Sequence, residues 1–115
     1  MILLPSRGEI WRVNLEPVLG HEQGRVRPAL ILSNNIFNHG NVGLVTIVPI
    51  TTKERPIRAF LRIDPSEGGL SQLSFIICDR IRTISRERLG KRFGAVSPQT
   101  LAEVERRVKF LLALR

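Results

Sequence analysis

The chain has 115 residues, a length at which we expect a single domain spanning 1–115 with a modest core. A hydrophobic fraction of 43% and a charged fraction of 24% are ordinary for a globular protein and exclude wholesale disorder. The net charge is +8, and 15 of the 18 basic residues are arginines, so the composition predicts a polyanionic or acidic partner. Genome composition or thermal adaptation would also explain the arginine excess.

The cysteine content and the apolar runs bear on where the protein resides. Cys78 is the single cysteine, which excludes a disulfide within the chain and indicates a cytoplasmic protein. The apolar start at 2–4 is too short for a secretory signal, and the longest apolar run, 44–50, is too short to span a membrane. We therefore expect a soluble cytoplasmic protein with no membrane association.

Short apolar runs separated by Gly, Pro, Asn and Asp predict a small barrel or sandwich. A single helical turn is expected at 34–38. The predicted strands are 9–14, 29–33, 43–50, 58–63, 74–78 and 91–95.

The C-terminal segment carries the strongest helix signal. Ser97 is a suitable N-cap, and Pro98 follows at the first helical position, where its missing N–H costs nothing. Apolar residues then recur on one face, which predicts a helix packed on the β core. They are Leu101, Val104, Val108, Leu111 and Leu112. Basic residues at 106, 107 and 109 lie off this stripe and are expected to form a solvated face.

The loop at 20–28 is the first candidate site because it gathers several kinds of polar side chain before an apolar run. His21 titrates near neutrality and suits proton transfer, although a loop histidine can simply hydrogen-bond its neighbours. Arg27 precedes Pro28 and is restricted to an extended backbone, so it could hold a phosphate or pair with a carboxylate such as Glu22 or Asp79.

Two further candidates follow apolar runs. Thr51 and Thr52 come directly after the run ending at Ile50, where their hydroxyls could bind a phosphate oxygen or cap the following turn. Asp79 follows another apolar run and precedes Arg80 and Arg82, which would keep its carboxylate ionised. A structural ion pair at a strand end would use the same residues.

The metal-ligating residues are too few and too scattered to predict a metal site. The chain has two histidines and one cysteine, no clustered acidic pair and no glycine-rich phosphate loop. Phosphoryl chemistry would have to proceed without a metal or cofactor, which favours RNA because its 2′-hydroxyl supplies the nucleophile.

Taken together, these motifs resemble those of the MazF/PemK family of toxin endoribonucleases over nearly the whole chain. The matching segments occur in the family's order at 7–11, 20–30, 48–52 and 78–84. The resemblance implies a mostly β fold with α, an SH3-like β-barrel of the MazF/PemK/CcdB type closed by the C-terminal helix. It also implies a homodimer, metal-independent cleavage of single-stranded RNA at short sequences, and an acidic antitoxin as partner.

The resemblance also suggests roles for the candidate residues. Arg27 and Thr51 match the positions that activate the phosphate in such enzymes. The expected RNA-binding residues are His21, Glu22, Gln23, Arg25, Thr52, Asp79 and Arg82.

Two positions depart from the family pattern. Some members carry an arginine, proposed as the general acid, two residues before the aspartate; here that residue is Ile77. Either His21 or Arg27 would then protonate the leaving oxygen, or a mechanism based on Arg27 and Thr51 applies and Asp79 mainly binds RNA. We favour the second interpretation. The loop's glycine pair is also changed, to Gly24 and Arg25.

Two other functions fit parts of the sequence. Gyrase-poisoning toxins share the implied fold and act by binding a protein, without cleaving RNA. A simple nucleic-acid-binding barrel would use the same positive charge and would bind RNA in a salt-dependent way without cutting it.

Overall fold

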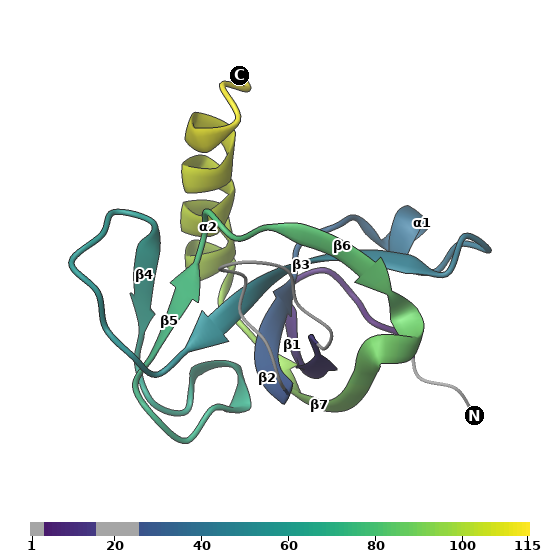
Figure 1. The fold of residues 1–115 in the computed structure, drawn as a ribbon, viewed down its shortest axis with the longest axis horizontal. Helices are drawn as coiled ribbons and strands as arrows, with labels where there is room; N and C mark the ends of the chain where they lie inside the picture. Colours follow the sequence, from purple (N-terminus) through teal and green to yellow (C-terminus); the bar gives the residue numbers. More distant parts are fainter. Residues whose placement is uncertain (1–3, 16–25) are drawn as a thin grey trace.

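The computed structural model describes residues 4–15 and 26–115, which form a mostly β fold with one long helix (Figure 1). The strands are β1 (Glu9–Asn14), β2 (Val26–Ile31), β3 (Leu44–Thr51), β4 (Phe60–Ile63), β5 (Ser74–Ile77), β6 (Arg82–Ser85) and β7 (Leu89–Ala95). The helical elements are α1 (Asn35–Asn38), the 3₁₀ turns η1 (Glu67–Gly69) and η2 (Arg86–Arg88), and the long helix α2 (Pro98–Leu111).

The strand predictions are confirmed in position, with shifted ends. β1 has the predicted limits, whereas β2 begins earlier than expected, at Val26, because Asn14 of β1 supplies its pairing partner. The four-residue strand β6 was missed, since so short a segment with a charged first residue carries little periodicity. It forms because Leu44 to Ile47 of β3 offer it a pairing edge.

The strands make one antiparallel sheet in the order β4-β5-β3-β2-β1-β7, with β6 also paired to β3. Within the described residues β4 and β7 stand at the two ends of this order, so the sheet is open. The prediction of a closed barrel is therefore wrong in this respect. η1 packs against β7.

The sheet has a hydrophobic core on each face, since successive side chains of a strand point to opposite faces. One core lies between the sheet and α2, and includes Ile10, Leu30, Val48, Ile76 and Val104. The other includes Trp11, Val13, Ala29, Ile47 and Ile84.

The predicted C-terminal helix is confirmed together with its N-terminal signals. The Ser97 side chain accepts a hydrogen bond from the Thr100 backbone N–H, and Pro98 occupies the first turn. Val104 and Val108 are buried against the sheet, but the last turns of α2 extend beyond the strands (Figure 1). None of the helices in the described part of the chain is long and apolar enough to cross a membrane.

Candidate functional site

Arg27 and Thr51 lie at the same end of two neighbouring strands. β2 and β3 are antiparallel, with Ala29 paired to Pro49. Continuing this register by two residues sets Arg27 opposite Thr51. Opposed residues of an antiparallel pair point to the same face of the sheet, so this register predicts that the two side chains lie on one face at the same end of β2 and β3.

Two prolines explain why the ladder stops short of this pair. Pro28 and Pro49 have no backbone N–H to donate, and the recorded pairing of β2 with β3 ends at Ala29 and Pro49. Arg27 and Thr51 therefore lie just beyond the last hydrogen-bonded pair. On its other side, Arg27 is paired with Val13 of β1.

The Thr51 hydroxyl caps the following turn, as the structural alternative predicted. Its Oγ1 accepts a hydrogen bond from the Lys53 backbone N–H at 3.2 Å, and the residue is only 4% exposed. A hydroxyl that accepts one hydrogen bond still has its own hydrogen to donate. Capping therefore orients this hydroxyl without using its donor. The adjacent Thr52 is exposed.

Asp79 and Arg82 are displaced from this pair along the strands. Thr51 pairs with Phe75, and Asp79 lies four residues later, in the turn that follows the end of β5 at Ile77. Arg82 pairs with Ile47, again four residues from Thr51. The Asp79 Oδ1 forms a long ion pair with the Arg80 Nε, at 3.9 Å.

Ile77, two residues before Asp79 and expected to be an arginine in some family members, cannot supply a proton. Ile77 is 1% exposed and is the last residue of β5. It forms part of the buried sheet, so its aliphatic side chain contributes packing only. Any general acid must come from elsewhere in the protein.

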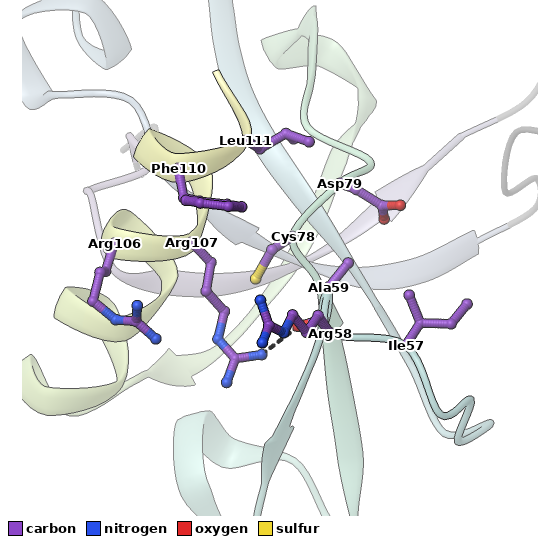
Figure 2. A pocket seen from close by; sticks show the side chains of 9 residues that line it. All are labelled: Ile57, Arg58, Ala59, Cys78, Asp79, Arg106, Arg107, Phe110 and Leu111. Atoms are coloured by element: carbon purple, nitrogen blue, oxygen red, sulfur yellow. Dashed lines mark hydrogen bonds between the residues drawn. The ribbon is translucent and has the colours of Figure 1, made fainter. Parts of the chain in front are cut away.

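A groove of about 530 Å³ lies between α2 and the neighbouring ends of β4 and β5. Figure 2 shows the residues that line it: Ile57, Arg58, Ala59, Cys78, Asp79, Arg106, Arg107, Phe110 and Leu111. Burial, only partly opposed by the nearby Arg107 charge, raises the pKa of the Cys78 thiol to about 11. The thiol is therefore protonated at neutral pH. Within this groove, Asp79 points away from Arg106 and Arg107 (Figure 2).

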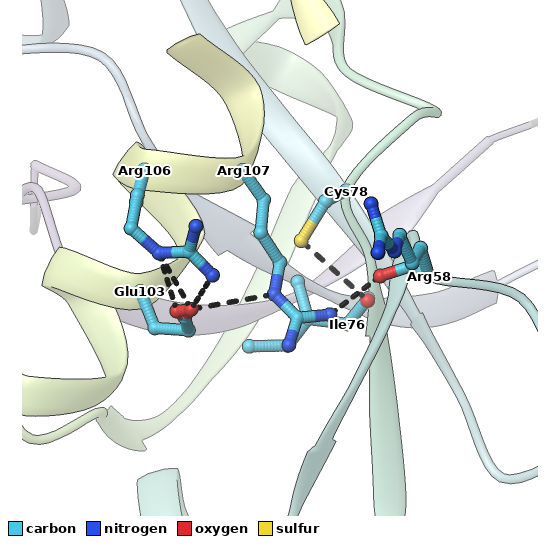
Figure 3. Close-up of polar contacts among 6 residues, drawn as sticks. All are labelled: Arg58, Ile76, Cys78, Glu103, Arg106 and Arg107. Carbon is cyan, nitrogen blue, oxygen red and sulfur yellow. Dashed lines mark hydrogen bonds and ion pairs between the residues drawn. The ribbon is translucent and has the colours of Figure 1, made fainter. Parts of the chain in front are cut away.

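Two arginines on the groove side of α2 share one carboxylate. Arg106 donates to Glu103 from Nε and Nη2, and the Arg107 Nε lies 3.6 Å from the same carboxylate (Figure 3). Arg107 also donates from Nη1 to the Arg58 carbonyl. The prediction that this part of α2 is merely a solvated face was wrong for Arg107, which the fold places against the turn before β4. Its position next to Val108, a residue of the apolar stripe, was the sequence signal that Arg107 would lie near the core.

The remaining predicted residues, His21, Glu22, Gln23 and Arg25, lie outside the described residues. Across 4–15 and 26–115, no three His, Cys, Asp or Glu side chains come together as a metal site would require.

Comparison with known proteins identifies the family. The profile of the PemK-like, MazF-like toxins of type II toxin–antitoxin systems matches residues 6–112. The chain belongs to this family. The toxin is 34% identical over 113 residues to the endoribonuclease MazF9 of Mycobacterium tuberculosis, with 94% of this chain and 96% of the relative covered.

Solved structures agree with this assignment. MazF from Deinococcus radiodurans matches the toxin with a TM-score of 0.86 and 29% identity, covering 98% of this chain and 100% of the other. A mycobacterial endoribonuclease solved in complex with its cognate antitoxin matches with a TM-score of 0.78 and 29% identity, covering 96% and 97%.

Proposed function

We propose that this toxin is an endoribonuclease that cleaves single-stranded messenger RNA at short sequences without a metal ion. The observation that supports the proposal is the antiparallel pairing of Ala29 with Pro49, since Arg27 and Thr51 each lie two residues beyond that pair at the same end of β2 and β3. Relatives named endoribonucleases support it. Here the protein supplies charge and positioning, and the RNA supplies the nucleophile.

In the proposed reaction the RNA 2′-hydroxyl attacks the adjacent phosphorus, and the bond from phosphorus to the 5′-oxygen breaks. The products are a 2′,3′-cyclic phosphate and a free 5′-hydroxyl. Arg27 stabilises the added negative charge of the phosphorane, and the Thr51 hydroxyl donates to a non-bridging oxygen. One proton leaves the 2′-hydroxyl and one is delivered to the departing 5′-oxygen.

The other predicted site residues would bind RNA. Thr52 directly follows β3, Asp79 lies in the turn after β5, and Arg82 begins β6, which is paired with β3. The loop residues His21, Glu22, Gln23 and Arg25 precede Arg27 in the chain and are proposed to read the bases.

The wider context is also a proposal. We infer a cytoplasmic homodimer made of one toxin domain per chain, controlled by an acidic antitoxin. The net charge of +8 supports an acidic partner, and a relative solved with its cognate antitoxin gives the precedent. We also propose that this open, antiparallel sheet belongs to the SH3-like barrel class.

The test is incubation of the purified protein with a long single-stranded RNA in excess EDTA, with sequencing of the new 5′ ends. We expect cuts at one short sequence. In Arg27→Ala the cleavage rate should fall by about 10²-fold or more, because removing one preorganised donor to the developing charge has an effect of this size. Arg62→Ala is the matched control, since Arg62 is exposed on β4 and paired with Asp64. Intact RNA with the wild-type protein would shift the assignment to a gyrase-type inhibitor or a simple binding protein.

Thr51 provides a second variant pair in the same assay. Thr51→Val keeps the side-chain shape but removes the hydroxyl, whereas Thr51→Ser keeps the hydroxyl. We expect the serine variant to cleave much faster than the valine variant. Equal rates for the two would remove Thr51 from the mechanism.

A further inference from the structure

Arg12 and Lys91 lie side by side on two paired strands at one end of the sheet order. β7 stands at that end and is paired with β1. The residues before and after Arg12 pair with Arg92 and Leu89 of β7, so Arg12 itself lies opposite both Gly90 and Lys91. Two residues opposite one make a β-bulge. Because both side chains are exposed, this bulge presents two positive charges to solvent.

Gly90 leaves room for the Arg12 guanidinium. A Cβ added to Gly90 would lie 3.1 Å from the Arg12 Nε and 3.2 Å from its Nη2. The guanidinium therefore rests on the backbone of β7, beside Lys91. Within the part of the chain that the structure describes, neither of the two cations forms an ion pair or a side-chain hydrogen bond. Both charges are thus free to bind an anion.

These two cations, which we call the Arg12–Lys91 patch, lie on the face of the sheet that α2 covers. Ile10, two residues before Arg12, belongs to the core beneath α2. Phe93, whose ring centre lies 5.9 Å from the Lys91 Nζ, packs against the same core. Arg27 is paired with a residue of the other core. Because alternate residues of a strand share a face, the patch and Arg27 lie on opposite faces.

The surroundings of the Arg12–Lys91 patch favour the phosphate backbone of RNA over an acidic protein. None of the exposed large apolar side chains among the described residues belongs to β1 or β7, so a protein segment would find no hydrophobic anchor there. Glu9 is the single carboxylate of these two strands, and on the other face it accepts hydrogen bonds from Trp11 and Arg92. A guanidinium fork beside an ammonium group suits the phosphates of one RNA strand.

We propose that the Arg12–Lys91 patch is a second RNA-binding site, which holds the backbone of a long RNA away from the point of cleavage. This inference rests on the proposed ribonuclease function and adds a binding step to it. RNA held at the patch keeps its remaining length close to the Arg27–Thr51 end of the same molecule, so cleavage becomes an encounter within one complex. A short RNA occupies one site at a time and gains nothing from the patch.

The first test measures binding of 2′-O-methylated single-stranded RNA, which is not cut, in lengths of about 6 and about 40 nucleotides. We expect Arg12→Ala/Lys91→Ala to bind the long RNA about tenfold more weakly than the wild type, with affinity for the short RNA changed by less than about twofold. For the long RNA, the slope of log affinity against log salt should become shallower by about 1.4, since each lost phosphate contact contributes about 0.7.

Two further variants separate the patch from general effects of charge. Arg62→Ala/Lys109→Ala removes two positive charges from β4 and α2, where each is paired with a carboxylate, and should bind the long RNA as the wild type does. Gly90→Asp keeps both cations but places a carboxylate beside the Arg12 guanidinium. It should therefore weaken binding of the long RNA as the removal of Arg12 does.

Cleavage in EDTA gives the second readout. For a long RNA, Arg12→Ala/Lys91→Ala should lower kcat/KM by about tenfold and leave kcat unchanged, because the patch binds RNA without touching the scissile phosphate. For a short RNA that contains the cleaved sequence, both constants should equal those of the wild type.

Three outcomes would overturn the inference. They are equal losses of affinity for the two RNA lengths, a patch variant that binds the long RNA as the wild type does, and a patch variant that loses only the binding of a polyglutamate peptide, which would assign the patch to an acidic protein. A protein that cleaves RNA yet gives any of these results would refute the second site alone. A protein that never cleaves RNA yet shows the length-dependent loss of binding would refute only the proposed ribonuclease.

Discussion

Neighbouring residues at the end of β5 differ sharply in what their surroundings allow them to do. Ile77 and Cys78 are both almost fully buried, at 1% and 2% exposure. The first has no polar group, and burial keeps the thiol of the second protonated. Asp79, the next residue, is exposed. Three consecutive residues therefore include a buried aliphatic side chain, a buried protonated thiol and an exposed carboxyl group.

Because of Cys78, we expect the free energy of unfolding to decrease at alkaline pH. Because its pKa in the folded protein is raised to about 11 from the ordinary value of 9.0, the folded chain holds the thiol proton more tightly than the unfolded chain does. This contribution to stability is complete below pH 9 and is lost as the pH rises towards 11. We expect the urea midpoint of the wild type to fall between pH 9 and 11.

The control for this effect is Cys78→Ala. The chain has no tyrosine and only a few lysines that titrate in the same window, so the variant should show a clearly flatter pH profile. Parallel profiles for wild type and variant would mean that the thiol is not desolvated.

Residue-level prediction succeeded where local chemistry decides. Ser97 caps α2 with its side chain, and Thr51 caps the turn at Lys53. It failed for Arg107, because Arg58, whose carbonyl accepts from this residue, lies about fifty positions earlier in the chain.

The contact between η1 and β7 depends on glycine. A Cβ on Gly69 would lie 2.0 Å from the Phe93 carbonyl oxygen, and one on Gly94 would lie 2.7 Å from the Gly68 carbonyl carbon. Gly69 also has a φ of +79°, a conformation that other residues rarely adopt. Two backbones therefore approach closely at the end of the sheet.

We expect Gly69→Ala to lower the free energy of unfolding by roughly 2 to 6 kcal/mol, from backbone strain and a steric clash together. Gly43→Ala is the matched control, since Gly43 has a φ of +78° but nothing within 4 Å of an added Cβ. That variant should lose only the strain component, about 1 kcal/mol. Urea denaturation measures both, and equal losses would show that the close approach is unimportant.

Element-level prediction was good for strand positions but missed one strand start and one whole strand. The predicted strand at 29–33 begins three residues earlier in the structure, and β6 was absent from the prediction. Both errors concern segments that become strands because a partner lies beside them, β1 for the start of β2 and β3 for β6.

At the scale of the whole molecule, the charge is unevenly neutralised. The net charge is +8, and several carboxylates already have cationic partners: Glu9 with Arg92, Glu105 with Arg7, and Glu103 with Arg106. The surplus is therefore carried by the remaining arginines, and the molecule attracts polyanions.

Binding of RNA should weaken steeply as salt is added. With a 2′-O-methylated single-stranded RNA, which cannot be cleaved by 2′-hydroxyl attack, the logarithm of affinity should fall linearly with the logarithm of salt concentration. Removing one phosphate contact with Arg27→Ala should make this slope shallower by about 0.7, whereas Arg62→Ala should leave it unchanged. An unchanged slope in the Arg27 variant would mean that Arg27 does not contact a phosphate.

The sequence by itself determined the family motifs, the mostly β character, the capped C-terminal helix and the basic charge. These follow from interactions between residues close together in the chain, such as the restriction that Pro28 places on Arg27. Only the tertiary structure decided that the sheet is open, that Thr51 pairs with Phe75 while Asp79 lies in the turn after β5, and that Arg58 and Phe110 border one groove. Strand register and helix docking join segments far apart in the sequence, and no local pattern specifies which segments will meet.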